Sequence, residues 1–144
     1  MELREINSEN WRDAVELKIA EAQKGFVAPN WYSLLEALYD PDREARAIYA
    51  GDAMVGFVLY GINQDDKHWW IVRFMIGEAH QKKGYGRQAL RQIIDHIKAN
   101  AGCDVIYLSF VTQNDVARKL YASEGFVDTG RVEEGEIIYR LDVG

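Results

Sequence analysis

The feature that most constrains this chain is a glycine-containing turn, Gln81 to Gly86, which lies between an apolar run and a helix-patterned run. Residues 69–76 are mostly apolar and favour a buried strand, whereas residues 87–98 repeat apolar side chains at helical spacing. A strand, a glycine turn and a helix start direct backbone N–H groups and the positive end of a helix dipole toward one point. This arrangement predicts a site for the diphosphate of a ligand.

Two properties of the turn support an anion site. A Cβ at Gly84 or Gly86 would obstruct the approach of phosphate oxygens and would resist the dihedrals of a tight turn. Residues 79–94 also contain four cations and no carboxylate, although the formal net charge of the chain is −6. These cations are Lys82, Lys83, Arg87 and Arg91. For this segment alone, the alternative is an exposed basic turn followed by an ordinary surface helix.

Composition limits the class of protein. A chain of 144 residues fits one domain, which we expect to span residues 1–144. A single cysteine excludes an intramolecular disulfide, and we see neither a secretion signal nor an apolar run of roughly 20 residues. The acidic balance argues against general nucleic-acid binding and suits a cationic small molecule. We therefore expect a cytoplasmic protein without a nucleic-acid or membrane partner.

The remaining apolar patterns predict a mixed sheet of about seven strands and about four helices. Strands are expected over residues 1–6, 45–50, 54–60, 69–76, 105–111, 126–129 and 136–143. Helices are expected over residues 31–39 and 87–98, between the candidate cap Asn7 or Ser8 and Gly25, and between Asn114 and Gly125. The helix between Asn7 or Ser8 and Gly25 would carry Ile19 and Ala22 on its apolar face. Because a helix joins strand 69–76 to strand 105–111, we expect these two strands to be parallel.

A second motif follows strand 105–111. It reads Asn114-x-x-Ala117-x-x-x-Tyr121-x-x-x-Gly125-Phe126. In order and spacing, the glycine turn and this motif together resemble the GNAT superfamily of N-acetyltransferases, and the resemblance covers essentially the whole chain. It implies an α/β (α+β) fold with a mixed, mostly antiparallel sheet and a central parallel pair. It also implies an enzyme that moves an acetyl group from acetyl-CoA to an amine, with no metal.

The resemblance implies that acetyl-CoA binds where the two central strands splay apart. The pantetheine arm would pair with the backbone of the first strand, the diphosphate would bind amides of the turn, and Asn114 would hold the pantetheine or the turn. The cofactor-binding residues implied are Phe74, Met75, Ile76, Gln81, Lys82, Lys83, Gly84, Tyr85, Gly86, Arg87, Asn114, Ala117 and Lys119.

The implied reaction is direct attack of the amine on the thioester, with both substrates bound and no acyl-enzyme. A backbone N–H near Met75 or Ile76 would stabilise the charge on the thioester oxygen. Tyr121 would be the catalytic residue, acting as general acid toward the departing thiolate. Taken alone, Tyr121 also fits a core aromatic on the helix face that carries Leu120.

The general base is not identified by the sequence. An alkyl amine has a pKa near 10 and is mostly protonated at neutral pH, so a proton must leave before attack. The strand before the glycine turn contains no carboxylate. The sequence leaves two sources of the base open: a water relay, or an acid from another element such as Glu36, Asp40 or Glu78.

The acceptor is predicted from a shorter resemblance. Residues 22–30 with Ser33 and Leu34, and residues 73–76, resemble bacterial spermine/spermidine N-acetyltransferases. This resemblance implies a polyamine acceptor, and relatives imply a homodimer. Two alternatives remain open: another amine, such as a peptide, an amino sugar or a toxic amine, or a non-catalytic sensor that binds acyl-CoA.

Overall fold

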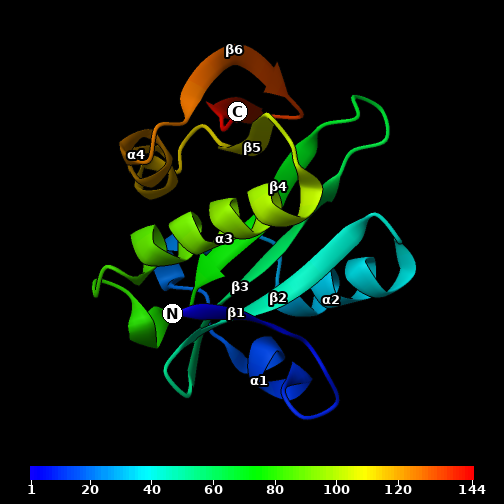
Figure 1. Ribbon diagram of the computed structural model, residues 1–144. Helices are drawn as coiled ribbons and strands as arrows, with labels where there is room; N and C mark the ends of the chain where they lie inside the picture. Colours follow the sequence, from blue (N-terminus) through cyan, green and yellow to red (C-terminus); the bar gives the residue numbers. More distant parts are fainter.

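The structure is a computed structural model that describes residues 1–144 with the exception of Ala22. Its described residues form one seven-stranded sheet in the order β1-β2-β3-β4-β5-β7-β6 (Figure 1). The strands are β1 (Glu2–Glu5), β2 (Arg43–Ala50), β3 (Ala53–Ile62), β4 (Trp69–Ile76), β5 (Val105–Val111), β6 (Val127–Glu133) and β7 (Glu136–Asp142). The helices are α1 (Trp11–Glu16), α2 (Asn30–Tyr39), α3 (Tyr85–Ala101) and α4 (Asp115–Ser123), with short 3-10 turns η1 (Glu21–Gln23) and η2 (Glu78–His80).

The central pair of the sheet is parallel, as expected. β4 pairs with β5 in parallel register and α3 connects them, whereas the other neighbouring strands pair antiparallel. The mixed, mostly antiparallel sheet that the sequence predicted is therefore confirmed. No helix in the described part of the chain is long and apolar enough to cross a membrane.

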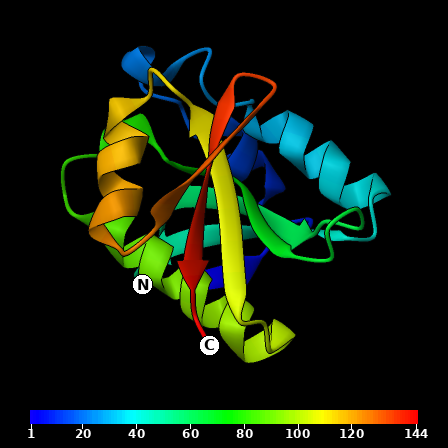
Figure 2. The same cartoon turned by 90° about the horizontal axis from the view of Figure 1, so that it is seen from above.

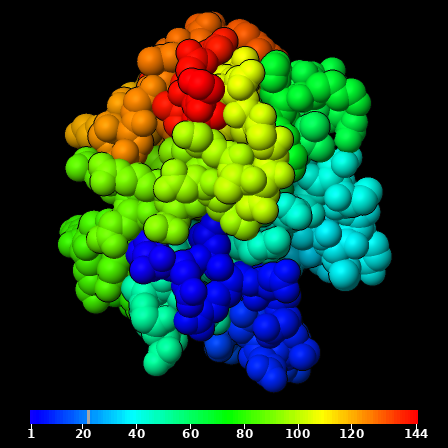
Figure 3. All heavy atoms as spheres, in the orientation of Figure 1, coloured from blue at the N-terminus to red at the C-terminus, as the bar shows by residue number. Residues whose placement is uncertain are grey.

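Helices cover both faces of the sheet. The apolar face of α3, with Leu90 and Ile93, packs in one core with Ile106 and Leu108 of β5. A second, smaller core on the other face combines Ala14 of α1 with side chains of β3 and β4. Figure 2 shows α4 and α2 on opposite sides of the strands. Figure 3 shows α3 packed closely against the segments that surround it. The sheet therefore has helices packed on both of its faces.

The first predicted helix is longer than the helix in the structure. We expected it to continue through Ile19 and Ala22, but α1 stops at Glu16 and the chain then becomes extended. The carbonyl of Lys18 instead accepts a hydrogen bond from the N–H of Glu78, at 2.7 Å. This bond ties the segment to the end of β4, and a carbonyl used in this way is lost to a continuing helix. Ala22 lies outside the described residues.

The last hairpin is longer than the sequence predicted. We expected a short strand over residues 126–129, but β6 continues to Glu133 and pairs with β7. The turn between them contains Glu134 and Gly135, both with positive φ. The hairpin brings the start of β7 beside the end of β5, a placement that matters for the site.

Gly61 provides a test of how closely β3 packs against the start of β2. An ideal Cβ there would lie 1.9 Å from the backbone oxygen of Asp42, so Gly61→Ala must displace the backbone. We predict a loss of unfolding free energy of about 3 kcal/mol, measured by urea denaturation.

Gly86→Ala is the matched control for stability. Its Cβ would meet only Leu120 Cδ2 at 3.6 Å, an ordinary contact, and alanine is favoured in a helix by about 0.5–1 kcal/mol. Equal stability of the two variants would contradict the packing described here.

Candidate active site

A bulge in β4 separates the two central strands. Val72 has no opposite partner in β3, because the register passes from Ile71 directly to Arg73. A bulge of this kind bends the strand and increases its local twist. The pairing of β4 with β5 ends at the same point, where Ile71 lies opposite Leu108. From there to its carboxyl end, β4 has no strand on the side that faces β5.

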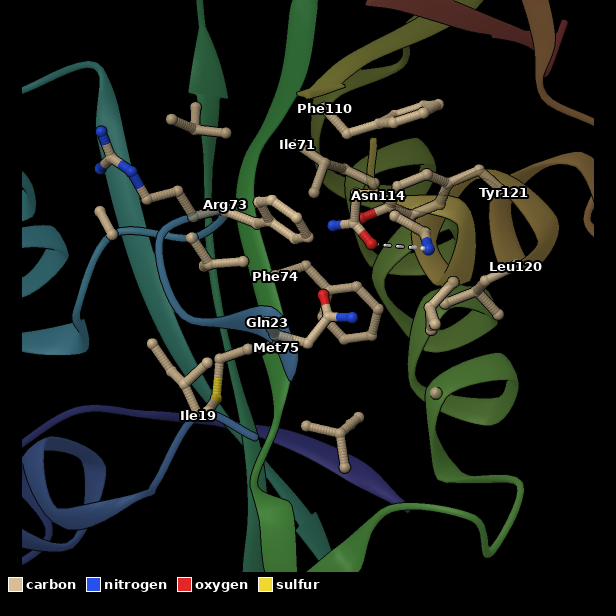
Figure 4. A pocket seen from close by; sticks show the side chains of 18 of the residues that line it. Ile19, Gln23, Ile71, Arg73, Phe74, Met75, Phe110, Asn114, Leu120 and Tyr121 are labelled. Carbon is tan, nitrogen blue, oxygen red and sulfur yellow. Dashed lines mark hydrogen bonds between the residues drawn. The ribbon is translucent and has the colours of Figure 1, made fainter. Parts of the chain in front are cut away.

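A cavity of about 740 Å³ occupies this opening. One wall is β4, the other is formed by β5 and α4, and the loop before α3 lines one end. Figure 4 shows Asn114, which caps the start of α4, and Tyr121 of α4 across the cavity from Phe74 and Met75 of β4. The sequence motifs that lie far apart in the chain thus meet in a single site.

The open edge of β4 presents backbone groups to the cavity. The N–H of Gly77 donates to the carbonyl of Val55 at 2.8 Å, which directs Gly77 toward β3. Since successive residues of a strand point their backbone groups to opposite sides, Ile76 and Phe74 face the open edge and Met75 faces β3. The Ile76 carbonyl is already used, because Gln81 Nε2 donates to it at 3.0 Å. The Ile76 N–H and both backbone groups of Phe74 are therefore available to a ligand.

The start of α3 lines the same end of the cavity as the loop before it. Gly84 precedes the helix with φ +78°, a left-handed conformation that glycine adopts without strain, and no side chain caps the helix. The first N–H groups of a helix have no partner within the helix. Gly84, Tyr85 and Gly86 line the cavity, so these donors lie beside it. The expectation that Gly86 also needs glycine for its dihedrals is wrong, because its φ is not positive.

Two of the cations near the turn are paired within the protein. Arg87 Nε lies 3.2 Å from Glu124 Oε1, and Arg91 Nε lies 3.0 Å from Glu124 Oε2. The Glu124 side chain is only 9% exposed. Local sequence could not reveal this pair, because Glu124 is distant in the chain. The positive field at the turn therefore depends mainly on Lys82, Lys83 and the amino-terminal end of α3.

The structure places most of the expected cofactor-binding residues around the cavity. Those that line it are Phe74, Met75, Ile76, Gln81, Lys82, Gly84, Tyr85, Gly86, Asn114 and Ala117. Lys83, Arg87 and Lys119 do not line it. In the described residues, no group of three or more His, Cys, Asp or Glu side chains is arranged to hold a metal.

Tyr121 projects from α4 into this cavity. Asn114 begins the helix, and its Oδ1 accepts a hydrogen bond from the N–H of Ala117 at 3.2 Å. The Tyr121 ring packs against Phe110 and Phe126, with ring centroids 5.6 and 5.9 Å away. Burial raises the pKa of Tyr121 above that of an ordinary phenol. The hydroxyl therefore stays protonated at neutral pH and can donate a hydrogen bond.

The candidate bases do not reach the cavity. Glu36 holds two cations, with Oε1 2.8 Å from Arg73 Nη1 and Oε2 3.2 Å from Arg43 Nε. Both arginines line the cavity, but Glu36 does not. Asp40 ends α2 and Glu78 lies in η2, and neither is a lining residue. A water relay that removes the proton of the acceptor amine therefore stays a prediction.

Sequence reasoning missed several polar residues of the site, among them Arg43, Ser109 and Glu136. Ser109 of β5 and Glu136 of β7 both line the cavity, and Ser109 Oγ donates to Glu136 Oε1 at 3.2 Å. Strand alternation could have placed Ser109 on one face of β5. The position of Glu136 depends on the register of β7 against β5, which local sequence does not specify.

Residues 2–126 match the family model described as the acetyltransferase (GNAT) family. The chain belongs to this family. The match confirms the fold and the enzyme class that the sequence predicted, an acetyl-CoA-dependent N-acetyltransferase.

Relatives add detail to the family assignment. The chain is 29% identical over 141 residues to spermine/spermidine N(1)-acetyltransferase of Bacillus subtilis, covering 91% of this chain and 90% of that protein. Its fold is similar to that of spermidine N-acetyltransferase from Vibrio cholerae in complex with CoA and spermine, with a TM-score of 0.74, 20% identity and coverage of 96% and 91%. It is also similar to a Salmonella typhimurium acetyltransferase that modifies the N-terminal serine of ribosomal protein L7/L12, with a TM-score of 0.63, 14% identity and coverage of 80% and 72%. The CoA-bound structure is consistent with acetyl-CoA as donor.

Gly86 provides a test of the diphosphate site. Gly86→Asp places a carboxylate beside the free N–H groups of α3, where it would repel a phosphate and compete for its donors. We predict roughly tenfold or greater loss of CoA affinity by titration calorimetry, with little loss of stability, because the position has room for a side chain.

Gly86→Asn is the control, since it has almost the same shape without the charge. We expect a smaller loss of affinity for this variant. CoA affinity of Gly86→Asp equal to that of the wild type would exclude this end of the cavity as the diphosphate site.

Proposed function

We propose that this protein acetylates a primary amine of a polyamine such as spermine or spermidine, by direct attack on acetyl-CoA in a ternary complex. The observation that carries the proposal is the juxtaposition of the open β4 edge with the Tyr121 hydroxyl across one cavity. A polyamine acceptor is supported by the Bacillus subtilis relative, which aligns over most of both chains.

In this proposal acetyl-CoA lies along the opening between β4 and β5. The diphosphate binds the free N–H groups at the start of α3, and the pantetheine pairs with the backbone of Phe74. The thioester oxygen, on which charge develops during attack, lies at the same open edge, where the N–H groups of Phe74 and Ile76 are the backbone donors available to it. The acceptor amine enters from the sheet face that carries α2 and attacks through the opening.

Tyr121 assists the leaving group in this scheme. As the carbon–sulfur bond breaks, the phenol donates to the sulfur and stabilises the thiolate. A simple thiol has a pKa near 8.5, below that of the buried phenol, so the thiolate is stabilised chiefly by a strong hydrogen bond.

Tyr121→Phe tests this role. We predict a roughly 100-fold fall in kcat with acetyl-CoA affinity and stability nearly unchanged, because only the hydroxyl is lost. Burial raises the pKa of the phenol, so the donor form is retained across neutral pH and should be lost only above the ordinary phenol pKa of about 10. A pH profile of kcat for both proteins checks this, and identical profiles and rates would remove the role.

A peptide amine is the second candidate acceptor. Arg43 and Arg73 line the cavity, and a pair of guanidinium groups would suit an acceptor that carries a carboxylate. The Salmonella typhimurium relative acts on a protein N-terminus.

A thiol-release assay with acetyl-CoA decides between these acceptors. The panel contains spermine, spermidine, peptides that end in a free amine or carry lysine, and aminoglycosides. We expect the highest kcat/KM with a polyamine. Tight acetyl-CoA binding without turnover of any amine would contradict the proposed function and favour a sensor. A cytoplasmic location, one domain over residues 1–144 and a homodimer stay predictions.

A further inference from the structure

Glu136 is the one carboxylate among the described residues that line the cavity. It is the first residue of β7 and lies opposite Val111, at the end of β5. Residues that lie opposite each other, and those two positions apart, project on the same face of a sheet. Glu136, Val111 and Ser109 thus share a face, in agreement with the 3.2 Å hydrogen bond from Ser109 Oγ to Glu136 Oε1.

This face is the one from which an acceptor would enter. The intervening β5 residues, Leu108 and Phe110, project into the core beneath α3 and α4. Ser109 and Glu136 therefore lie on the other face, the one that carries α2. Trp70 also lines the cavity, and its ring stacks on Tyr107 with centroids 5.2 Å apart. The carboxylate thus lies on the same face of the sheet as the stacked rings of Trp70 and Tyr107.

The Glu136 carboxylate has no cationic partner among the described residues. Its hydrogen bond from Ser109 comes from a neutral hydroxyl, and none of the ion pairs includes it. Arg118 of α4 has other partners, since it donates to the carbonyl of Thr112 at 2.7 Å and to the Tyr139 hydroxyl at 3.5 Å. A partly buried carboxylate without a cation gains most from a cationic ligand.

The chemistry of transfer decides which nitrogen this carboxylate suits. The attacking nitrogen must lose its proton, so a carboxylate beside it would act as a general base, and its loss would slow every amine alike. A second nitrogen that keeps its charge has the opposite requirement. We propose that Glu136, held in place by Ser109, binds the unreactive ammonium of a diamine or polyamine and so selects acceptors with a second positive charge.

This proposal rests on the proposed function, and its test compares acceptors that differ only in the second charge. Steady-state kinetics are measured for the wild type and Glu136→Gln with 1,4-diaminobutane, spermidine and n-butylamine. Glutamine keeps the shape and the bond from Ser109 but removes the charge. We expect kcat/KM for the two polycations to fall roughly 10- to 100-fold, with n-butylamine and the KM for acetyl-CoA changed less than twofold.

Glu133→Gln is the matched control. Glu133 lies on the same hairpin and pairs opposite Glu136, but its side chain is exposed, pairs with Arg131 at 2.8 Å and does not line the cavity. We expect this variant to behave as the wild type with every amine. Ser109→Ala should reproduce part of the Glu136→Gln loss, again only with polycations.

The outcomes separate this inference from the proposed function. If Glu136→Gln loses activity equally with mono- and polyamines, or loses none, selection by Glu136 is wrong although the enzyme is an amine acetyltransferase. If the wild type acetylates no amine, the proposed function fails. In that case, titration calorimetry of spermidine into the CoA complex still tests whether Glu136 binds the ammonium. Equal spermidine affinity of the wild type and Glu136→Gln overturns the inference.

Discussion

The bulge at Val72 is the feature on which the site depends. Up to Ile71, β4 pairs with β5 as in any parallel pair, and beyond it the two strands have no register in common. An unpaired strand edge inside a protein is costly unless its N–H and C=O groups find partners. One carbonyl is satisfied by Gln81, and the others face a cavity that a ligand can fill. The break in the sheet therefore creates the cavity and leaves backbone donors of β4 free to bind a ligand there.

The two sides of this break have different chemistry. On the side of α3 and α4 the cavity meets the free N–H groups of a helix start and a buried phenol, which suit a diphosphate and a sulfur leaving group. On the side of α2 it meets Arg43 and Arg73 with their shared partner Glu36, and Glu136, which has no cationic partner among the described residues. Charges on this side nearly balance, so an acceptor is recognised by individual contacts and not by a uniformly acidic surface.

Much of the fold and part of the site follow from local sequence. The glycine turn, the amphipathic α3 and the cap at Asn114 are local patterns, and the structure contains each of them. The end of α1 was not predictable, because it depends on a hydrogen bond from Glu78, far along the chain. Local sequence did not reveal the partner of Arg87 or the position of Glu136 for the same reason, because each is fixed by strand register or by helix packing across the sheet.

The central claim is that acetyl-CoA occupies the opening between β4 and β5. A crystal structure of the protein with CoA tests it most directly. The account predicts the diphosphate at the first turn of α3, the pantetheine hydrogen-bonded to the backbone of Phe74, and the sulfur within hydrogen-bond distance of the Tyr121 hydroxyl. A CoA molecule bound elsewhere on the surface, or a sulfur far from that hydroxyl, would contradict it.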